Sequence, residues 1–447
     1  MKVGWIVGAL AFVALRAAFA SRWGLLADEA YFWTWSQHLA AGYLDQPPLV
    51  AWLVAGGTAL AGRSELGVRL LFLPMATLLL AVVPLGRDRA GLALALLGLP
   101  PLAGLTWFAL PDGPMLAAWA IAVAGAAAGG WGWAVAGAAA GVAFEAKYTG
   151  ILVFPLLLVA ADPAERRSRP VAVGAAAAVA LALPNVLWNL QNDLATFGFV
   201  SADGLGRAFS PWGWLTQPLG QVLLVGPIFF GAAVAWAARG PGEGRIDRIA
   251  WWTSVPVFVG FTAAAAFGEG EAHWPAPAWI GASVGLFRVD GRVGRAAGLG
   301  AALAAVATAA AAVHATTPIV ALRSDPRWQL EEGYALAAAA SAWVLPAPDE
   351  AARPVVAERY QEASMLAFYL DLPVLRIAGC GRLDQRARWP ETAAPAVSSW
   401  LVRPARGGDD TCAEGWGVAG GHRLVGRDAA GGERGAWDLL ELEPGGP

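Results

Sequence analysis

The sequence predicts an all-α polytopic membrane domain followed by a small soluble α/β domain. Hydrophobic residues make up 57% of the 447-residue chain and charged residues only 15%. Long apolar segments recur over residues 1–317, and the composition becomes more polar from about Pro318. A chain this apolar cannot hide its hydrophobic surface in a water-soluble core. The net charge of −3 indicates no particular partner, and no basic patch of the kind that binds nucleic acid is present.

The apolar segments expected in the membrane domain lie at residues 3–20, 66–86, 90–110, 114–129, 131–146, 148–161, 170–187, 217–238, 249–267, 272–288 and 295–315. Several are shorter than the roughly 20 residues that span a bilayer. The segments between 131 and 161 are therefore expected to be tilted, extended at their ends or partly re-entrant. No convincing cleavage site follows residues 1–20, which predicts a retained first helix.

Arginine clusters orient these segments in the membrane. They lie in four short connections, at residues 87–89, 166–169, 239–248 and 288–295. If the apolar run 47–61 dips into the membrane and returns, or lies in the interface, all four connections share a side with Lys2. The positive-inside rule makes that side cytoplasmic. The sequence thus predicts about 11 crossings, additional interfacial helices and an external C-terminus.

The same topology gathers polar residues on the outer face, at 28–29, 45, 112, 145–148, 185–191 and 269–274. Polar groups at the ends of apolar segments are costly unless they line a wet cavity. Their convergence on one face therefore predicts a functional site. Loop residues are polar in any case, which is the alternative explanation.

The stretch 28–50 is the most distinctive of these. It opens with two acids, Asp28 and Glu29. One face of the short helix expected next is apolar and aromatic and carries Tyr31, Phe32, Trp35 and Leu39. Thr34, Gln37 and His38 are expected to face elsewhere. This pattern is typical of a helix in the membrane–water interface, where Trp and Tyr settle.

The C-terminal domain, residues 318–447, is expected to hold strands at 355–357, 374–378, 399–402 and 438–442 and a helix at 361–370. Both cysteines of the chain, Cys380 and Cys412, lie in it. Outside the cytoplasm they can pair as a disulfide. They can also remain unpaired, because a small buried cysteine needs no partner.

The loop DEAYFWTWSQHLAAGYLDQPPL resembles the first outer loop of membrane glycosyltransferases with the C-type fold. The resemblance is to the bacterial branch similar to protein O-mannosyltransferases and the lipid A aminoarabinose transferase (glycosyltransferase families 39 and 83). Further matches follow in the same order, LPDGPMLAAW (110–119), AKYTG (146–150), LPNVLWNLQND (183–193), HWPAPAW (273–279) and RYQEASMLAFYL (359–370). The resemblance therefore covers most of a transmembrane domain 1–317, with its outer catalytic loop 21–49, and reaches the external domain.

This resemblance implies transfer of a hexose or pentose from a polyprenyl-phosphate donor to a lipid, glycan or protein acceptor. The reaction would take place on the outer face of the bacterial cytoplasmic membrane, in contact with membrane lipids. A sugar-lipid transporter or flippase is the alternative from another class. Transporters are usually built from repeats with polar groups near the midplane, and the sequence shows no such repeat. A scaffold that presents the outer domain leaves the paired acids unexplained.

The resemblance implies catalytic roles for three acids. Asp28 matches the loop acid and is the candidate general base, with Glu29 as its partner or as an ordinary helix-start acid. Asp112 matches the second outer acid. It could bind a substrate hydroxyl, share a divalent metal cation with Asp28, or merely begin a helix.

Lys147, one of two lysines beside 29 arginines, is expected to neutralise the donor phosphate or to reach the headgroups. Gln46 stands where the aminoarabinose transferase has a lysine, which leaves the donor open. The other candidate substrate-binding residues are Tyr43, Asp45, Tyr148, Trp188, Asn189, His273 and Trp274. The sequence does not identify the sugar, the acceptor or the length of the carrier.

Overall fold

The computed structural model describes residues 2–196, 198–199, 209–268, 270–320, 322, 324–345, 353–377, 384–389, 397–405, 416–428 and 431–444. The chain forms two compact units. Unit 1 comprises Met1–Ala18, Ala40–Leu53 and Arg69–Val313, and unit 2 comprises Phe19–Leu39, Val54–Val68 and His314–Pro447. The predicted division into domains 1–317 and 318–447 stays a prediction. Glu269, Cys380 and Cys412 lie outside the described residues, so the expected disulfide does too.

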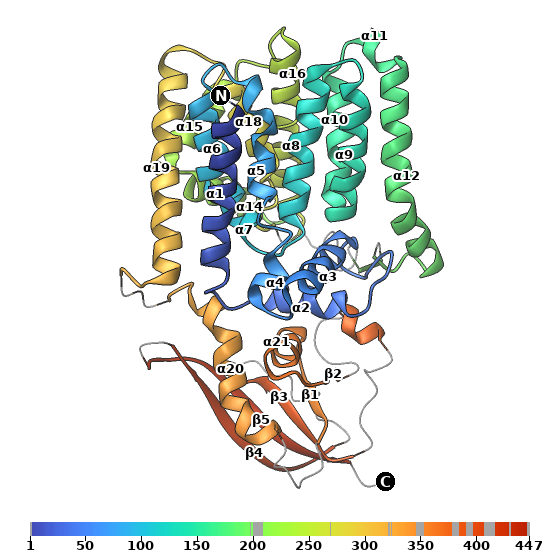
Figure 1. The fold of residues 1–447 in the computed structure, drawn as a ribbon, viewed down its shortest axis with the longest axis vertical. Coiled ribbons are helices and arrows are strands. Elements are labelled where there is room, and N and C mark those ends of the chain that lie inside the picture. The colour runs from blue at the N-terminus through green and yellow to red at the C-terminus, as the bar shows by residue number, and fades with distance from the viewer. Residues whose placement is uncertain are drawn as a thin grey trace. The chain divides into compact units, whose positions relative to one another are not determined.

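Unit 1 is built from helices (Figure 1). Its elements are α1 (Lys2–Ala20), the first part of α3 (Leu49–Ala61), α5 (Met75–Leu78), η1 (Leu79–Leu85), α6 (Arg89–Gly98), α7 (Pro100–Trp107), α8 (Asp112–Ala128), α9 (Gly132–Ala146), η2 (Tyr148–Leu152), α10 (Val153–Ala160), α11 (Pro163–Arg166), α12 (Arg169–Gln191), α14 (Pro211–Val225), α15 (Pro227–Ala237), α16 (Arg245–Trp252), α17 (Val255–Ala265), α18 (Ala278–Leu286) and α19 (Gly291–Thr316). The short α4 (Glu65–Arg69) stands at the boundary with unit 2.

The apolar helices make this a membrane protein. Over the described residues, α12 and α19 are long and apolar enough to span a bilayer, and the number rises to four if each bent pair is one span. Those pairs are α6 with α7, bent by 56°, and α14 with α15, bent by 118°. In both pairs a proline begins the second helix, where its missing N–H interrupts the hydrogen-bond ladder. The expected number of about 11 crossings stays a prediction.

The expected apolar segment 66–86 is broken along its length. Residues 66–86 form α4, α5 and η1 instead of a single span. Pro74 precedes α5 and Pro84 lies inside η1, so this apolar run cannot keep one unbroken ladder of backbone hydrogen bonds. Composition showed that the run is apolar but not where it breaks.

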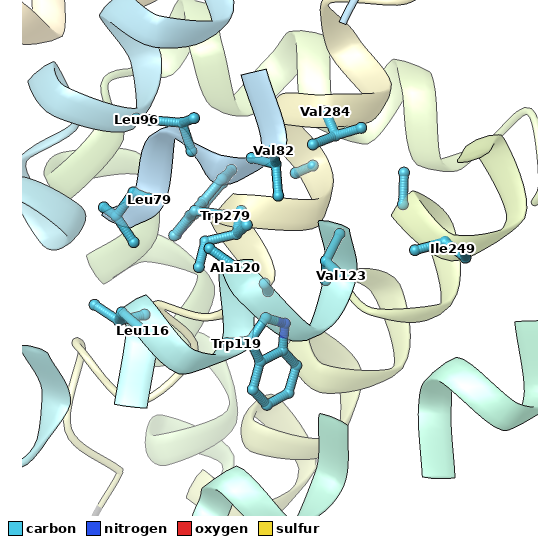
Figure 2. Close-up of a cluster of buried hydrophobic side chains, with 14 of the residues drawn as sticks. Leu79, Val82, Leu96, Leu116, Trp119, Ala120, Val123, Ile249, Trp279 and Val284 are labelled. Carbon is cyan, nitrogen blue, oxygen red and sulfur yellow. The ribbon is translucent and has the colours of Figure 1, made fainter. Parts of the chain in front are cut away.

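Part of the core of unit 1 lies between η1, α6, α8 and α18 (Figure 2). Trp119 and Trp279 are almost fully buried there beside aliphatic side chains such as Leu79 and Val284. Between membrane helices, close packing rather than release of water supplies most of the attraction.

Helices α9 and α12 approach most closely through glycine. A Cβ atom added to Gly137 would lie 2.0 Å from the carbonyl oxygen of Gly174, so only glycine allows this contact. Further along, a Cβ atom on Gly141 would lie within 3.0 Å of Leu181 and of the Ala178 carbonyl. The pairing advances along both helices in the same direction and brings the end of α12 beside the end of α9.

Unit 2 combines α2 (Ala27–Ser36) with a five-stranded mixed sheet. Its other elements are α20 (Trp328–Val344), β1 (Val355–Ala357), α21 (Tyr360–Leu370), β2 (Val374–Arg376), η3 (Gln385–Arg388), β3 (Ser399–Pro404), β4 (Trp416–Arg427) and β5 (Glu433–Pro444). The sheet order is β2-β1-β3-β5-β4, with β1 parallel to β2 and β3 and the other pairs antiparallel. The four expected strands and the expected helix are confirmed. Strand β4 and helix α20, which packs on β4, were not predicted (Figure 1).

The expected one-sided burial of α2 is wrong. Residues 29–36 are all buried, including Thr34, whose hydroxyl donates to the Tyr31 carbonyl. The reason is α21, which packs on α2 and places Phe368 edge-on against Trp33 at 5.2 Å between ring centroids. Because α21 lies more than 320 residues further along the chain, no local pattern could reveal that partner.

Candidate active site

A buried ion pair joins two of the predicted residues in unit 1. Asp112 begins α8, and Lys147 follows the last residue of α9 in an extended conformation. Lys147 Nζ donates to both carboxylate oxygens of Asp112, at 2.8 and 2.9 Å. The two side chains are only 12% and 7% exposed. The two hydrogen bonds hold the Lys147 ammonium in a fixed position, and its side chain does not extend to the solvent.

His273 lies beside this pair. Its Nε2 is 4.0 Å from Asp112 Oδ2, and its Nδ1 is 3.5 Å from Glu271 Oε2. Two glutamines of α14 hold the loop that carries it. Gln217 donates to the Glu271 carbonyl at 3.2 Å, and Gln221 donates to the carbonyl of Ala272. His273 is thus positioned by backbone contacts around it.

Sequence reasoning missed the two glutamines. Gln217 and Gln221 are buried and four residues apart, so they share one face of an apolar helix. Gln221 Oε1 also accepts a hydrogen bond from Trp279 Nε1 at 2.9 Å. Polar side chains at this spacing inside an apolar segment were the available signal. The predicted Trp274 packs on Phe261, with ring centroids 6.1 Å apart.

A second polar cluster surrounds Tyr148. Its hydroxyl lies 3.3 Å from Asn185 Oδ1 and 3.4 Å from Thr196 Oγ1. Asn189 Nδ2 donates to Asn185 Oδ1 at 3.1 Å, and Thr196 Oγ1 donates to the Tyr43 carbonyl at 3.0 Å. The cluster therefore links the end of α12 to the first loop through Thr196, which lies just beyond the motif at 183–193.

The other loop residues of unit 1 are partly covered. Tyr43 is fully buried, and burial raises the pKa of its phenol to about 12, although the Ala40 N–H donated to its oxygen opposes the rise. Trp188 lies against Gly42, where an added Cβ would come within 2.5 Å of the indole ring. Asp45 and Gln46 are half-buried between this loop and α3. Tyr43 therefore shapes the loop rather than exchanging protons.

Glu145 is a further buried carboxylate at the end of α9. Neither oxygen has a hydrogen-bond partner among the residues that the structure describes, and the same holds for Asn185 Nδ2. The pairing of α9 with α12 through Gly137 and Gly174 brings both residues to the same end of the helix pair. The polar end of these helices thus carries unused hydrogen-bonding groups as well as the ion pair.

Asp28 and Glu29 lie in unit 2, at the start of α2. Glu29 is fully buried, and its Oε2 accepts the Leu26 N–H at 3.0 Å, as expected of a helix-start acid. Asp28 is exposed, and its Oδ1 accepts the Tyr360 hydroxyl at 3.0 Å. Of the three predicted catalytic acids, Asp28 is the one with an exposed side chain.

The predicted metal site does not fit the donors around Asp112. Both of its oxygens already bind the Lys147 ammonium, whose charge repels a divalent cation. Throughout the described segments, no three His, Cys, Asp or Glu residues form a group that could hold a metal ion. Sharing of a cation by Asp28 and Asp112 stays a prediction.

The fold and these sites are those of a polytopic membrane protein resembling the C-type glycosyltransferases, and comparison with known proteins confirms that resemblance. The family model described as dolichyl-phosphate-mannose-protein mannosyltransferase matches residues 45–188. That region contains Asp45, Asp112, Lys147 and Tyr148, together with the α9–α12 pair.

Individual relatives agree with this class. The lipid A galacturonosyltransferase RgtD of Rhizobium johnstonii is 29% identical over 290 residues, which are 58% of this chain and 59% of the relative. The chain therefore spans about three fifths of the length of that curated relative. The crystal structure of ArnT from Cupriavidus metallidurans in the apo state matches with a TM-score of 0.65 and 18% identity over 98% of both chains. The same protein bound to undecaprenyl phosphate gives the same score and identity over 99% of this chain and 98% of that one. The structural matches show a shared fold.

Proposed function

We propose that this protein is an integral membrane glycosyltransferase that moves a sugar from a polyprenyl-phosphate donor to a lipid acceptor. The single observation that carries the proposal is the buried Lys147–Asp112 pair, because it holds a fixed cation at the polar end of apolar helices. The relatives support the substrate classes, since RgtD is named for lipid A and ArnT was solved with undecaprenyl phosphate. We propose further that the protein lies in the bacterial cytoplasmic membrane with its C-terminal domain outside the cytoplasm.

Lys147 binds the donor phosphate in this mechanism. An ammonium has three N–H donors, and the two bonds to Asp112 leave capacity for a phosphate oxygen. Asp112 orients Lys147, and His273 beside it can donate a further hydrogen bond to the phosphate. Charge that develops on the leaving phosphate meets donors that are already in place, which lowers the barrier without costly reorganisation.

Asp28 acts on the acceptor. Its carboxylate takes the proton of the acceptor hydroxyl as that oxygen attacks the anomeric carbon of the sugar. The bond between the anomeric carbon and the phosphate oxygen breaks, and its electron pair leaves with the polyprenyl phosphate. Asp28 later releases the proton to water. Tyr148, Trp188 and Asn189 provide hydrogen-bonding and stacking groups for the sugar, a hexose or a pentose.

The proposal is tested by sugar transfer with purified protein in nanodiscs and a radiolabelled polyprenyl-phosphate sugar. Lipid, glycan and protein acceptors are supplied separately, so that the labelled product identifies the acceptor class. We expect a labelled lipid and release of polyprenyl phosphate. Passage of intact donor across a vesicle membrane without cleavage would instead show a sugar-lipid transporter.

Donor binding tests the role of Lys147. A charge-assisted hydrogen bond contributes about 1.5–3 kcal/mol, so Lys147→Ala should weaken donor binding by about 10- to 100-fold. Lys147→Arg, which keeps the charge, should weaken it less. Lys2→Ala, at the chain's other lysine, is the control and should bind normally. Wild-type affinity in both Lys147 variants would remove the lysine from the donor site.

Topology is tested with reporter fusions. A reporter after Gly242 should be cytoplasmic and one after Pro348 external, because the arginine clusters mark the inner side. The reverse result would place the proposed chemistry on the cytoplasmic face and contradict the use of an external acceptor.

A further inference from the structure

The helix that carries Asp28 is held by the sheet domain of unit 2. Helix α21 packs along α2 at several points. Phe368 contacts Trp33, and the Tyr369 hydroxyl accepts the Leu25 N–H at 2.7 Å, just before α2 begins. These contacts fix the axis of α2, yet they do not touch the Asp28 carboxylate.

Tyr360, at the start of α21, contacts that carboxylate directly. Its hydroxyl donates to Asp28 Oδ1 at 3.0 Å. Its ring lies 4.4 Å from the ring of Tyr31, between centroids, one turn along α2 from Asp28. The Tyr31 ring is itself fixed, because its hydroxyl accepts the Gln385 N–H at 2.7 Å. Packing of its ring against the fixed ring of Tyr31 therefore holds the Tyr360 hydroxyl in place.

We propose that Tyr360 is a positioning residue that fixes the Asp28 carboxylate for proton transfer. This inference rests on the proposed function, in which Asp28 is the general base. The proposed role of Tyr360 concerns the motif at residues 359–370. That motif lies outside residues 45–188, the region that the family model matches.

The physical reason is the exposure of Asp28. An exposed carboxylate can rotate among several orientations, and only some of them aim an oxygen at the acceptor hydroxyl. A hydroxyl donor held in place selects one orientation and favours the charged form, which is the form that accepts a proton. Because productive geometry must be held closely for proton transfer, loss of this donor lowers the rate of the chemical step.

The test compares two tyrosines of the same helix. Tyr360→Phe removes the donor to Asp28 and keeps the ring. Tyr369→Phe is the matched control, because it removes a hydroxyl that accepts the backbone N–H of Leu25 at the start of α2. Turnover, donor KM and thermal stability are measured for both variants, for Asp28→Asn, and for the double variant Asp28→Asn with Tyr360→Phe.

We expect Tyr360→Phe to lower kcat about tenfold or more, the size typical of a hydrogen bond to a charged group, with an unchanged donor KM. Tyr369→Phe, which loosens the start of α2, should lower thermal stability and reduce kcat by no more than a few fold. The double variant should be no slower than Asp28→Asn alone, because both changes act on one group. A purely structural Tyr360 would lower stability and leave kcat intact.

The experiment distinguishes failure of the Tyr360 positioning role from failure of the proposed function. If Asp28→Asn is inactive and Tyr360→Phe turns over at the wild-type rate, the positioning role is overturned and the proposed function stands. If Asp28→Asn itself turns over normally, the general base has been misassigned, and the role of Tyr360 falls with it. Equal losses of kcat in Tyr360→Phe and Tyr369→Phe would show a general effect of α21 packing and would also overturn the inference.

Discussion

Asp112 and Asp28 are the same side chain in opposite surroundings. Asp112 lies in unit 1 with 7% of its side chain exposed and with both oxygens bound to an ammonium. Asp28 lies in unit 2, is exposed, and accepts a neutral hydroxyl from Tyr360. A carboxylate whose two oxygens bind a buried ammonium holds that cation in place, whereas an exposed carboxylate is accessible to the hydroxyl of an acceptor. The surroundings therefore divide two roles that the sequence motifs could not separate.

The largest expected effect follows from Asp28→Asn, which keeps the volume of the side chain and removes its basicity. General-base catalysis typically contributes about 10²–10⁴-fold in rate, so turnover should fall by that order. Donor affinity should change little, because the phosphate is assigned to Lys147. Turnover and thermal stability are measured together, and a folded variant with wild-type turnover would remove Asp28 from the chemistry.

Asp112→Asn should instead act on stability. It leaves Lys147 buried without its counter-charge, and breaking a buried pair in this way typically costs about 3–5 kcal/mol. The matched control is the double variant Asp112→Asn with Lys147→Met, which removes the stranded charge and should recover most of the lost stability. Thermal unfolding in detergent measures both. A single variant as stable as the wild type would show that the Asp112–Lys147 ion pair does not stabilise the folded protein.

Glu362 offers a third carboxylate environment, on the same helix as Tyr360. It is buried, and burial raises its pKa from an ordinary 4.5 to about 7, with Arg359 opposing the rise and Glu332 and Glu358 adding to it. Because the folded state holds this proton more tightly than the unfolded chain, its stabilising contribution is complete below about pH 4.5 and is lost as the pH rises through about 7.

Glu362→Gln removes this titration. The variant should therefore be more stable than the wild type at pH 8, by an amount on the order of 1–3 kcal/mol, and little different near pH 4. Melting temperatures across that range measure the difference. A constant difference at all pH values would mean that Glu362 does not titrate between the folded and unfolded states in this window.

Sequence patterns predicted the features that depend on local chemistry. The apolar segments, four of the five described strands of the C-terminal domain and the choice of Lys147 as a candidate follow from composition and spacing. Some failures were local, such as the breaks at Pro74 and Pro84, but the contacts of the candidate site depend on distant partners. The Tyr360–Asp28 bond joins residues 332 positions apart, and Gln217 meets the Glu271 carbonyl 54 positions away. The resemblance identified the acids as a set, and only the contacts show which of them is already neutralised.

The smallest expected effect is that of Glu29→Gln, and it decides whether the two opening acids of α2 share a role. Glu29 is fully buried and accepts the Leu26 N–H, so its charge stabilises the start of the helix. A favourable charge at a helix N-terminus is worth about 0.3–1 kcal/mol, and glutamine keeps an acceptor oxygen for the same N–H.

We therefore expect a small loss of thermal stability in Glu29→Gln. Since about 1.4 kcal/mol corresponds to a tenfold change in rate, turnover should fall only a few fold, through displacement of Asp28. The variant is assayed beside Asp28→Asn under the same conditions. If Glu29→Gln stays folded and loses as much turnover as Asp28→Asn, the buried acid takes part in proton transfer. The assignment of separate roles to exposed Asp28 and buried Glu29 would then be wrong.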